Sequence, residues 1–352
     1  MLNSKPSILR VTRTEDFEHA YKRDLAQYFF GLDVTMDKPT IGIIGLGPIG
    51  SILAAHLTSG GTNVIVEDIA KDLLAKIMKD GLKVSGIREF FARIENVVGS
   101  LAKLAQFEPD IVFVTTKACF LKNVLAELKP VYTPRMRLVS FQNGLDNERL
   151  IAETLGIDTV YRVVINYAGN LVASGEVQLN WFQPPNYIGA FRKGQYTTDE
   201  TTKYIAKIMT KCELTTEESS DIKSHVWEKT ILNAALCSIC ALTGQTMKEA
   251  MEFEFSHDLA VKVLEEGLSV AKADGYNFGK DALDRFTGYL EKGGAHKPSM
   301  LVDVENKRMT EVDFMSGAIA AYGERYNVET PVNRVLTGLL KSLESRYSSK
   351  RA

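Results

Sequence analysis

Three glycines stand between an apolar run and a helix-like segment, and they restrict the possible folds of this chain more than any other feature. They form a G-x-G-x-x-G pattern directly after the residues IGII and before SILAAHLTS. A dinucleotide-binding turn needs glycine because the chain bends sharply, the backbone approaches a pyrophosphate, and the helix packs close to the strand. The alternative is a glycine-rich turn of an ordinary α/β protein. We expect a cofactor to bind at Gly45, Leu46, Gly47, Pro48, Ile49 and Gly50.

The pattern of apolar residues predicts two different domains behind a short appendage. Apolar runs alternate with helical patterns over residues 40–164, which indicates βαβ units and a mainly parallel sheet. Residues 165–190 have hairpin character, and from residue 198 the pattern is helical. We therefore expect an α/β fold: an appendage at 1–39 with one amphipathic helix through Phe17 and Phe29, a Rossmann domain with its connecting segment at 40–197, and an all-α substrate domain at 198–352.

Charge and cysteine content argue against several other classes of protein. The 352 residues carry 42 Lys and Arg against 44 Asp and Glu, a net charge of -2, so we expect no nucleic-acid or membrane-surface partner. Four cysteines are too few for a disulfide scaffold, and the sequence has no signal peptide or membrane span, so we expect a soluble, cytoplasmic protein. Cys237 and Cys240 have CxxC spacing, but they lie in an apolar run without a second CxxC pair. Buried packing of these cysteines is therefore favoured over zinc or redox chemistry, and no metal is expected.

Two acids follow the second predicted strand, where the type of nicotinamide cofactor is decided. Glu67 and Asp68 lie 17 and 18 residues after Gly50, close to the spacing of about 20 that is usual for the acid that binds the ribose. A carboxylate accepts from the ribose hydroxyls of NAD and repels a 2′-phosphate. We therefore expect NAD to be slightly favoured, while Lys71 nearby leaves NADP open.

One predicted helix carries polar residues on a single face. Lys229, Asn233 and Cys237 are four residues apart, so they share that face of an otherwise apolar helix. A buried lysine and amide are costly unless they are paired or used, although a snorkelling lysine and a core asparagine would explain them too. Farther on, Glu311 and Asp313 stand near a helix start, where capping is an equally good explanation.

Taken together, GLGPIG, VTTKA at 114–118, QNG at 142–144, WEKTILN, SML-x-D and R-x-T-E-V-D resemble the ketopantoate reductase family over residues 40–343. The resemblance implies a Rossmann domain followed by a helical domain similar to that of 6-phosphogluconate dehydrogenase. It also implies reduction of the 2-keto group of 2-dehydropantoate by a nicotinamide hydride. By the same resemblance, Lys229 is the general acid and Glu311 orients it or binds the substrate hydroxyl. Further roles are implied for Asn143 and Asn233 at substrate and nicotinamide, Ser299 at the substrate carboxylate, and Lys117 near the cofactor phosphates.

The chain departs from the family pattern at two places. Cys237 stands where studied members have a second substrate-contacting asparagine, and Glu67-Asp68 stands where a basic residue is more common. Three functions therefore remain: 2-dehydropantoate reduction, reduction of another keto acid, or non-catalytic dinucleotide sensing. A sensor has no use for Lys229, Asn233, Ser299 and Glu311. The expected partner is a small keto acid, and a homodimer is possible.

Overall fold

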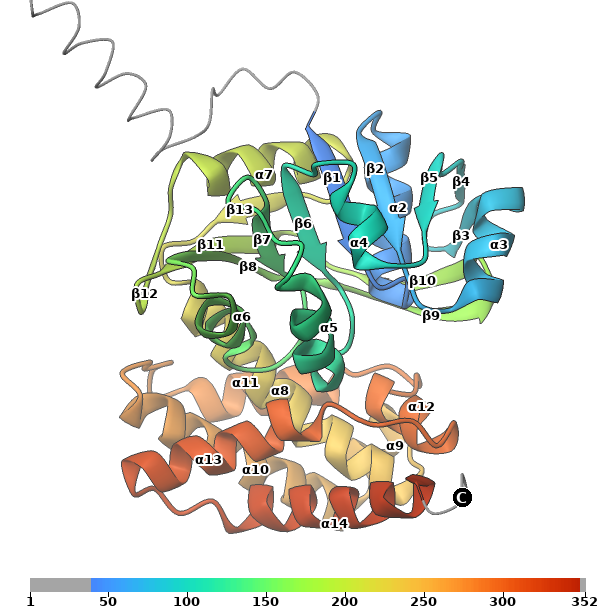
Figure 1. Cartoon of the computed structure of the whole chain (residues 1–352). Helices are drawn as coiled ribbons and strands as arrows, with labels where there is room; N and C mark the ends of the chain where they lie inside the picture. The colour runs from blue at the N-terminus through green and yellow to red at the C-terminus, as the bar shows by residue number, and fades with distance from the viewer. Residues whose placement is uncertain (1–38, 349–352) are drawn as a thin grey trace, which may run out of the picture. The chain divides into compact units, whose positions relative to one another are not determined.

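The computed structural model describes residues 39–348 of the chain (Figure 1). The amphipathic helix expected near Phe17 and Phe29 lies outside the described residues. The Rossmann domain and the helical domain expected from the sequence are both present.

Within residues 39–348, nine strands form the main sheet. In spatial order they are β12 (Gln195–Thr197), β11 (Asn186–Arg192), β8 (Thr159–Val164), β7 (Arg137–Ser140), β6 (Ile111–Val114), β1 (Thr40–Ile44), β2 (Asn63–Glu67) and β5 (Asn96–Val98), and β13 (Thr216–Glu218) pairs with β11. The strands from β8 to β5 are parallel, whereas β11 pairs antiparallel with both β8 and β12.

The chain reverses its direction across this sheet between β1 and β6. From β1 it proceeds outward to β2, and it later returns to place β6 on the other side of β1. In an open parallel sheet, ligands bind at such a switch point, beyond the carboxyl ends of the strands. The glycine turn follows β1 directly, so it lies at this point.

The parallel strands are apolar because both faces of the sheet are covered. Ile41 and Ile43 point to one face and Ile44 to the other, as the period of two for a strand requires. One face is packed by α4 (Leu101–Ala105), α5 (Leu121–Leu128) and α6 (Asn147–Leu155), and the other by α2 (Pro48–Ser59) and α7 (Glu200–Lys211). Helix α3 (Lys71–Asp80) lies beside β5, and the short helix η1 (Ala118–Phe120) follows β6.

The connecting segment forms part of a second sheet. The hairpin of β9 (Tyr167–Ala173) and β10 (Glu176–Phe182) pairs with β3 (Leu82–Gly86), which in turn pairs with β4 (Phe90–Ala92). This four-stranded sheet packs on α2 and shares the core of the main sheet. The hairpin therefore belongs to the first domain.

Helices make up the remainder of the described chain, arranged around α8 (Ile222–Thr243). The others are α9 (Met247–Glu252), α10 (Glu254–Ala273), α11 (Ala282–Glu291), α12 (Ser299–Glu305), η2 (Val312–Phe314), α13 (Ser316–Tyr326) and α14 (Pro331–Ser348). Helix α8 is apolar on nearly every side because it is the buried centre of this layer. Helix α7 lies beyond the expected boundary at residue 198, yet its buried Ile205 and Met209 join the core of the sheet. The helical layer thus begins at α8, because the apolar face of α7 finds its partners on β11 and β13.

Candidate active site

The three glycines of the turn have three different surroundings. Gly45 has a φ of +94°, and a Cβ there would lie 2.6 Å from Thr116 Cγ2. A Cβ on Gly50 would lie 2.0 Å from the carbonyl oxygen of Gly45, so α2 packs against the turn as closely as glycine permits. At Gly47, which precedes Pro48 at the start of α2, a Cβ would meet nothing within 4 Å. Two glycines therefore build the turn, and the third leaves open space at a helix N-terminus, which fits a bound pyrophosphate.

The acids after β2 differ in their surroundings. The Asp68 carboxylate accepts from Leu46 N at 2.7 Å and from Ala70 N at 2.8 Å, which ties it to the glycine turn. Glu67 is buried, and this burial, with the charges of Asp68 and Glu127, raises its pKa to about 7. Both carboxylates thus lie beside the turn, one as a backbone acceptor and the other as a buried group.

Two contacts join the end of β6 to the helical layer. Lys117 forms an ion pair with Asp303 of α12, and the Glu311 carboxylate accepts from Ala118 N at 2.9 Å. Glu311 is buried, and burial raises its pKa. Within residues 39–348 its carboxylate makes no hydrogen bond to Lys229. The contacts place Lys117 and Glu311 at the same segment, beside the carboxyl end of β6.

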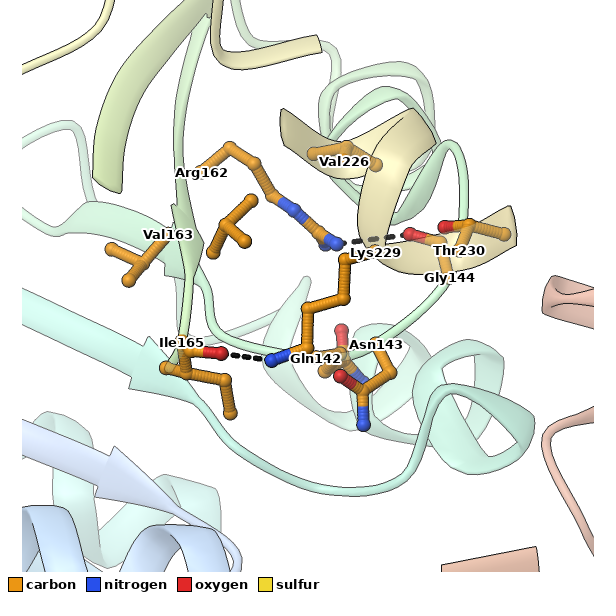
Figure 2. Close-up of a pocket in the computed structure, with 10 residues that line it drawn as sticks. Gln142, Asn143, Gly144, Arg162, Val163, Ile165, Val226, Lys229 and Thr230 are labelled. Atoms are coloured by element: carbon orange, nitrogen blue, oxygen red, sulfur yellow. Dashed lines mark hydrogen bonds between the residues drawn. The ribbon is translucent and has the colours of Figure 1, made fainter. Parts of the chain in front are cut away.

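Lys229 extends from α8 toward the carboxyl end of β8, where its Nζ donates to the carbonyl oxygen of Ile165 (Figure 2). The Nζ also lies 5.8 Å from the centre of the Trp181 ring. Burial, with the charge of Arg162, lowers the pKa of Lys229 to about 7. A lysine with this pKa can give or take a proton near neutral pH.

Lys229 lines a narrow pocket together with the residues that follow β7 and β8. Gln142 and Asn143 come from the loop after β7, and Figure 2 shows them close to the end of the Lys229 side chain. Gln142 Nε2 donates to Thr116 O at 2.8 Å, whereas its buried Oε1 has no hydrogen-bond partner within residues 39–348. The pocket therefore offers an acceptor as well as the lysine ammonium.

Arg162 also lines this pocket, and the sequence analysis did not identify it. Its guanidinium donates to Ser140 Oγ and to Gly144 O, each at 2.9 Å, and lies 3.6 Å from Glu148 Oε2. Both charged side chains are buried. The one signal available in the sequence is an arginine within the apolar strand TVYRVV, which is unusual because a buried charge needs a partner.

The remaining expected residues lie at varying depths. Cys237 is buried on α8, and Asn233 is half-buried one turn nearer to Lys229. Burial raises the pKa of the Cys237 thiol, and the charges of Glu311 and Lys229 both act on it. Ser299 is exposed in the first turn of α12 and does not line the pocket. The structure thus gathers Lys229 and Asn143 at one pocket, whereas Ser299 lies outside it.

The CxxC pair shows no features of a reactive site. Cys237 and Cys240 are free and buried in the core of the helical layer, and burial raises the pKa of Cys240 to about 12. Among residues 39–348 no cluster of three or more His, Cys, Asp or Glu could hold a metal ion. No helix in the same part of the chain is long and apolar enough to cross a membrane.

Comparison with known proteins gives consistent matches along the chain. Residues 41–193 match the family model described as ketopantoate reductase PanE/ApbA, and residues 221–344 match that of its C-terminal domain. A 2-dehydropantoate 2-reductase of Archaeoglobus fulgidus is 30% identical over 309 residues, which cover 87% of this chain and 98% of the relative. One from Pyrococcus abyssi is 28% identical over 312 residues, covering 88% and 99%.

Solved structures show the same fold at lower identity. A PanE/ApbA family ketopantoate reductase from Ralstonia eutropha superposes with a TM-score of 0.77 at 21% identity, covering 88% of this chain and 99% of its own. A D-mandelate dehydrogenase in complex with NADH and anilino(oxo)acetate gives 0.76 at 21% identity with the same coverage.

Proposed function

The chain belongs to the ketopantoate reductase family, an oxidoreductase family, and from this premise we propose that it reduces the 2-keto group of 2-dehydropantoate to pantoate. The named relatives support this substrate, since two of them span nearly the whole described chain. The observation that carries the proposal is Lys229, a lysine whose pKa is lowered to about 7 in a pocket beyond the carboxyl ends of the parallel strands.

We propose that the cofactor is NAD(H) or NADP(H), held by the turn from Gly45 to Gly50. The open space at Gly47 supports a pyrophosphate there. The buried Gln142 Oε1, which has no hydrogen-bond partner within residues 39–348, could accept a hydrogen bond from the bound ligand. When bound, the reduced nicotinamide supplies the hydride that goes to the keto carbon. The Asp68 carboxylate beside the turn supports a slight preference for NAD, because a 2′-phosphate would meet negative charge there. Glu67 contributes less, because its raised pKa of about 7 leaves it partly protonated at neutral pH.

In the proposed reaction Lys229 acts as the general acid. Its ammonium donates a hydrogen bond to the keto oxygen, stabilises the negative charge that develops there, and transfers a proton from Nζ to that oxygen. The carbonyl oxygen of Ile165, which now accepts from this ammonium, keeps it aimed into the pocket. A lowered pKa favours the transfer, because the ammonium gives up its proton near neutral pH.

Other residues are proposed to hold the reactants. Asn143 lies beside Lys229 and Asn233 one turn along the helix, so both amides can contact substrate or nicotinamide. Lys117 and Glu311 lie at the segment after β6, and we propose them to contact the cofactor phosphates and the substrate hydroxyl respectively. Ser299 at the start of α12 is proposed for the substrate carboxylate, and this role requires α12 to approach the pocket when substrate binds.

A second substrate is favoured by one observation. Cys237 replaces an amide that would contact 2-dehydropantoate, and burial keeps its thiol protonated by raising its pKa. A thiol is a weak hydrogen-bond partner, so the proposed alternative is reduction of another, less polar 2-keto acid.

The test is oxidation of NADH and of NADPH, measured side by side with a panel of 2-keto acids that includes 2-dehydropantoate. The proposal expects 2-dehydropantoate to give the highest kcat/KM. A higher value for another 2-keto acid would establish the alternative, and no turnover of any 2-keto acid would refute both. The homodimer, the cytoplasmic location and the expected domain limits stay predictions.

A further inference from the structure

A second cavity, of about 430 Å³, opens beside the amino-terminal end of α8. Its walls come from α6, the start of β12, the start of α8, the residues after α10 and the end of α13. It shares no lining residue with the pocket of Lys229. The volume is within the range of small-molecule sites, and the lining is polar rather than apolar, so it suits a charged ligand.

The acids at this cavity already have donors. Asp274 accepts from Trp227 Nε1 at 2.9 Å and from Tyr326 OH at 2.5 Å. Asp146, just behind the wall, accepts from Lys223 Nζ at 2.7 Å and from Tyr322 OH at 2.7 Å. Asp221 is the exception, and it is exposed at the rim.

The basic side chains at this cavity, by contrast, have N–H groups that make no hydrogen bond within the described part of the chain. The Arg325 guanidinium makes no hydrogen bond or ion pair within residues 39–348, and it lies 5.3 Å from the centre of the Tyr326 ring. Arg149 has a buried Nε without a hydrogen-bond partner in the same range, and its nearest carboxylate oxygen, on Asp146, is 3.9 Å away. Buried Lys223 uses one of its three N–H groups on Asp146.

Tyrosine rings hold the cations in place. Lys223 Nζ lies 5.7 Å from the ring centre of Tyr196 and 5.6 Å from that of Tyr322. A cation over a ring face is stabilised without losing its N–H donors. Guanidinium and ammonium groups that are already held in place lose less side-chain entropy when a ligand binds. Several such donors at one cavity favour a ligand with several acceptor oxygens.

We propose that this cavity is a second ligand site, which binds a small oxyanion, a carboxylate or a phosphate, between Arg149, Arg325 and Lys223. Tyr276, which also lines the cavity, has its pKa raised to about 12 by burial and by Asp274, so it remains a hydroxyl donor at neutral pH. The site is independent of the catalytic proposal, because none of its residues takes part in that reaction.

Isothermal titration of the full chain with inorganic phosphate, malonate and adenosine monophosphate tests the proposal. At least one of these should bind in the millimolar range or tighter. Arg325→Gln should weaken that binding about tenfold or more, since a hydrogen bond to a charged group is lost. Arg325 is exposed, so its replacement should leave the fold intact; Arg149→Gln is the second variant.

Two control variants separate this cavity from the catalytic pocket and from exposed arginines elsewhere, while a loss of binding in Arg325→Gln separates it from the glycine turn. Arg285→Gln removes an exposed arginine of α11 that pairs with Asp281 at 2.9 Å, and Lys229→Ala removes the cation of the catalytic pocket. Both should bind the anion as the unmodified chain does. The proposal is overturned if none of the three anions binds, if Arg325→Gln binds as before, or if Lys229→Ala alone loses binding. Binding of malonate only would identify a carboxylate ligand, and binding of phosphate and the nucleotide only would identify a phosphate ligand.

Discussion

Raising the pH through neutrality should switch off the proposed reaction, because Lys229 must be protonated to act as the acid. Burial and the charge of Arg162 lower its pKa to about 7. One pH unit above its pKa, about one tenth of a group remains protonated. We therefore expect kcat/KM for the keto acid to be level below pH 7 and to fall about tenfold per unit above it.

The assay is steady-state reduction of the best keto acid at saturating cofactor, from about pH 6 to about pH 9. Saturation with cofactor matters because Glu67, beside the glycine turn, also has a pKa of about 7 and would affect cofactor affinity. Lys229→Ala should lower kcat by about 10²–10⁴ and remove the descending limb, while cofactor affinity stays near normal. Lys262→Ala, an exposed lysine on α10, is the matched control and should keep both rate and profile.

Two results would refute this reasoning. A level profile up to pH 9 would mean that Lys229 has an ordinary pKa or no role as the acid. A Lys229→Ala enzyme that keeps most of its kcat, or the same descending limb, would assign the proton to another group in the cleft.

Three further predictions concern the cofactor and Glu311. Gly47→Val should leave the melting temperature unchanged and abolish NADH binding, because its side chain would fill only the open space at the turn. Gly50→Ala should instead lower the free energy of unfolding by roughly 1–3 kcal/mol, because its Cβ would contact Gly45 O. Equal NADH affinity in a folded Gly47→Val chain would contradict the cofactor site. The acids after β2 predict that NADH serves at least as well as NADPH, and a kcat/KM more than about tenfold higher with NADPH would show the prediction to be wrong. Glu311→Gln should lower kcat, less than additively in combination with Lys229→Ala; strict additivity would indicate that the two residues act separately.

The parts of the fold with a local signal were predictable from the sequence. The glycine turn, the alternating strands and helices, and the shared face of Lys229 and Asn233 each follow from spacing over a few residues. The structure confirms the Rossmann domain and the helical domain that these patterns predict.

Features that depend on distant pairing were not predictable. The apolar face of α7 shows that the helix is buried but not against which layer, and it packs on the sheet. The pairing of the β9–β10 hairpin with β3 has no local signature. The hydrogen bond from Ala118 N to Glu311 joins residues 193 positions apart, so the capping explanation for Glu311 could not be decided from the sequence. Arg162 could be recognised only as an anomaly within its strand.

The core of the helical layer has a consequence for how the chain can be divided. Leu145 and Val164, which follow β7 and end β8, are buried in the same apolar cluster as Trp227 and Ile231 of α8. A fragment that begins at α8 would lack these side chains and expose the apolar residues that they cover. The two regions matched by separate family models therefore share a buried apolar core, and we expect each to be less stable when it is expressed without the other.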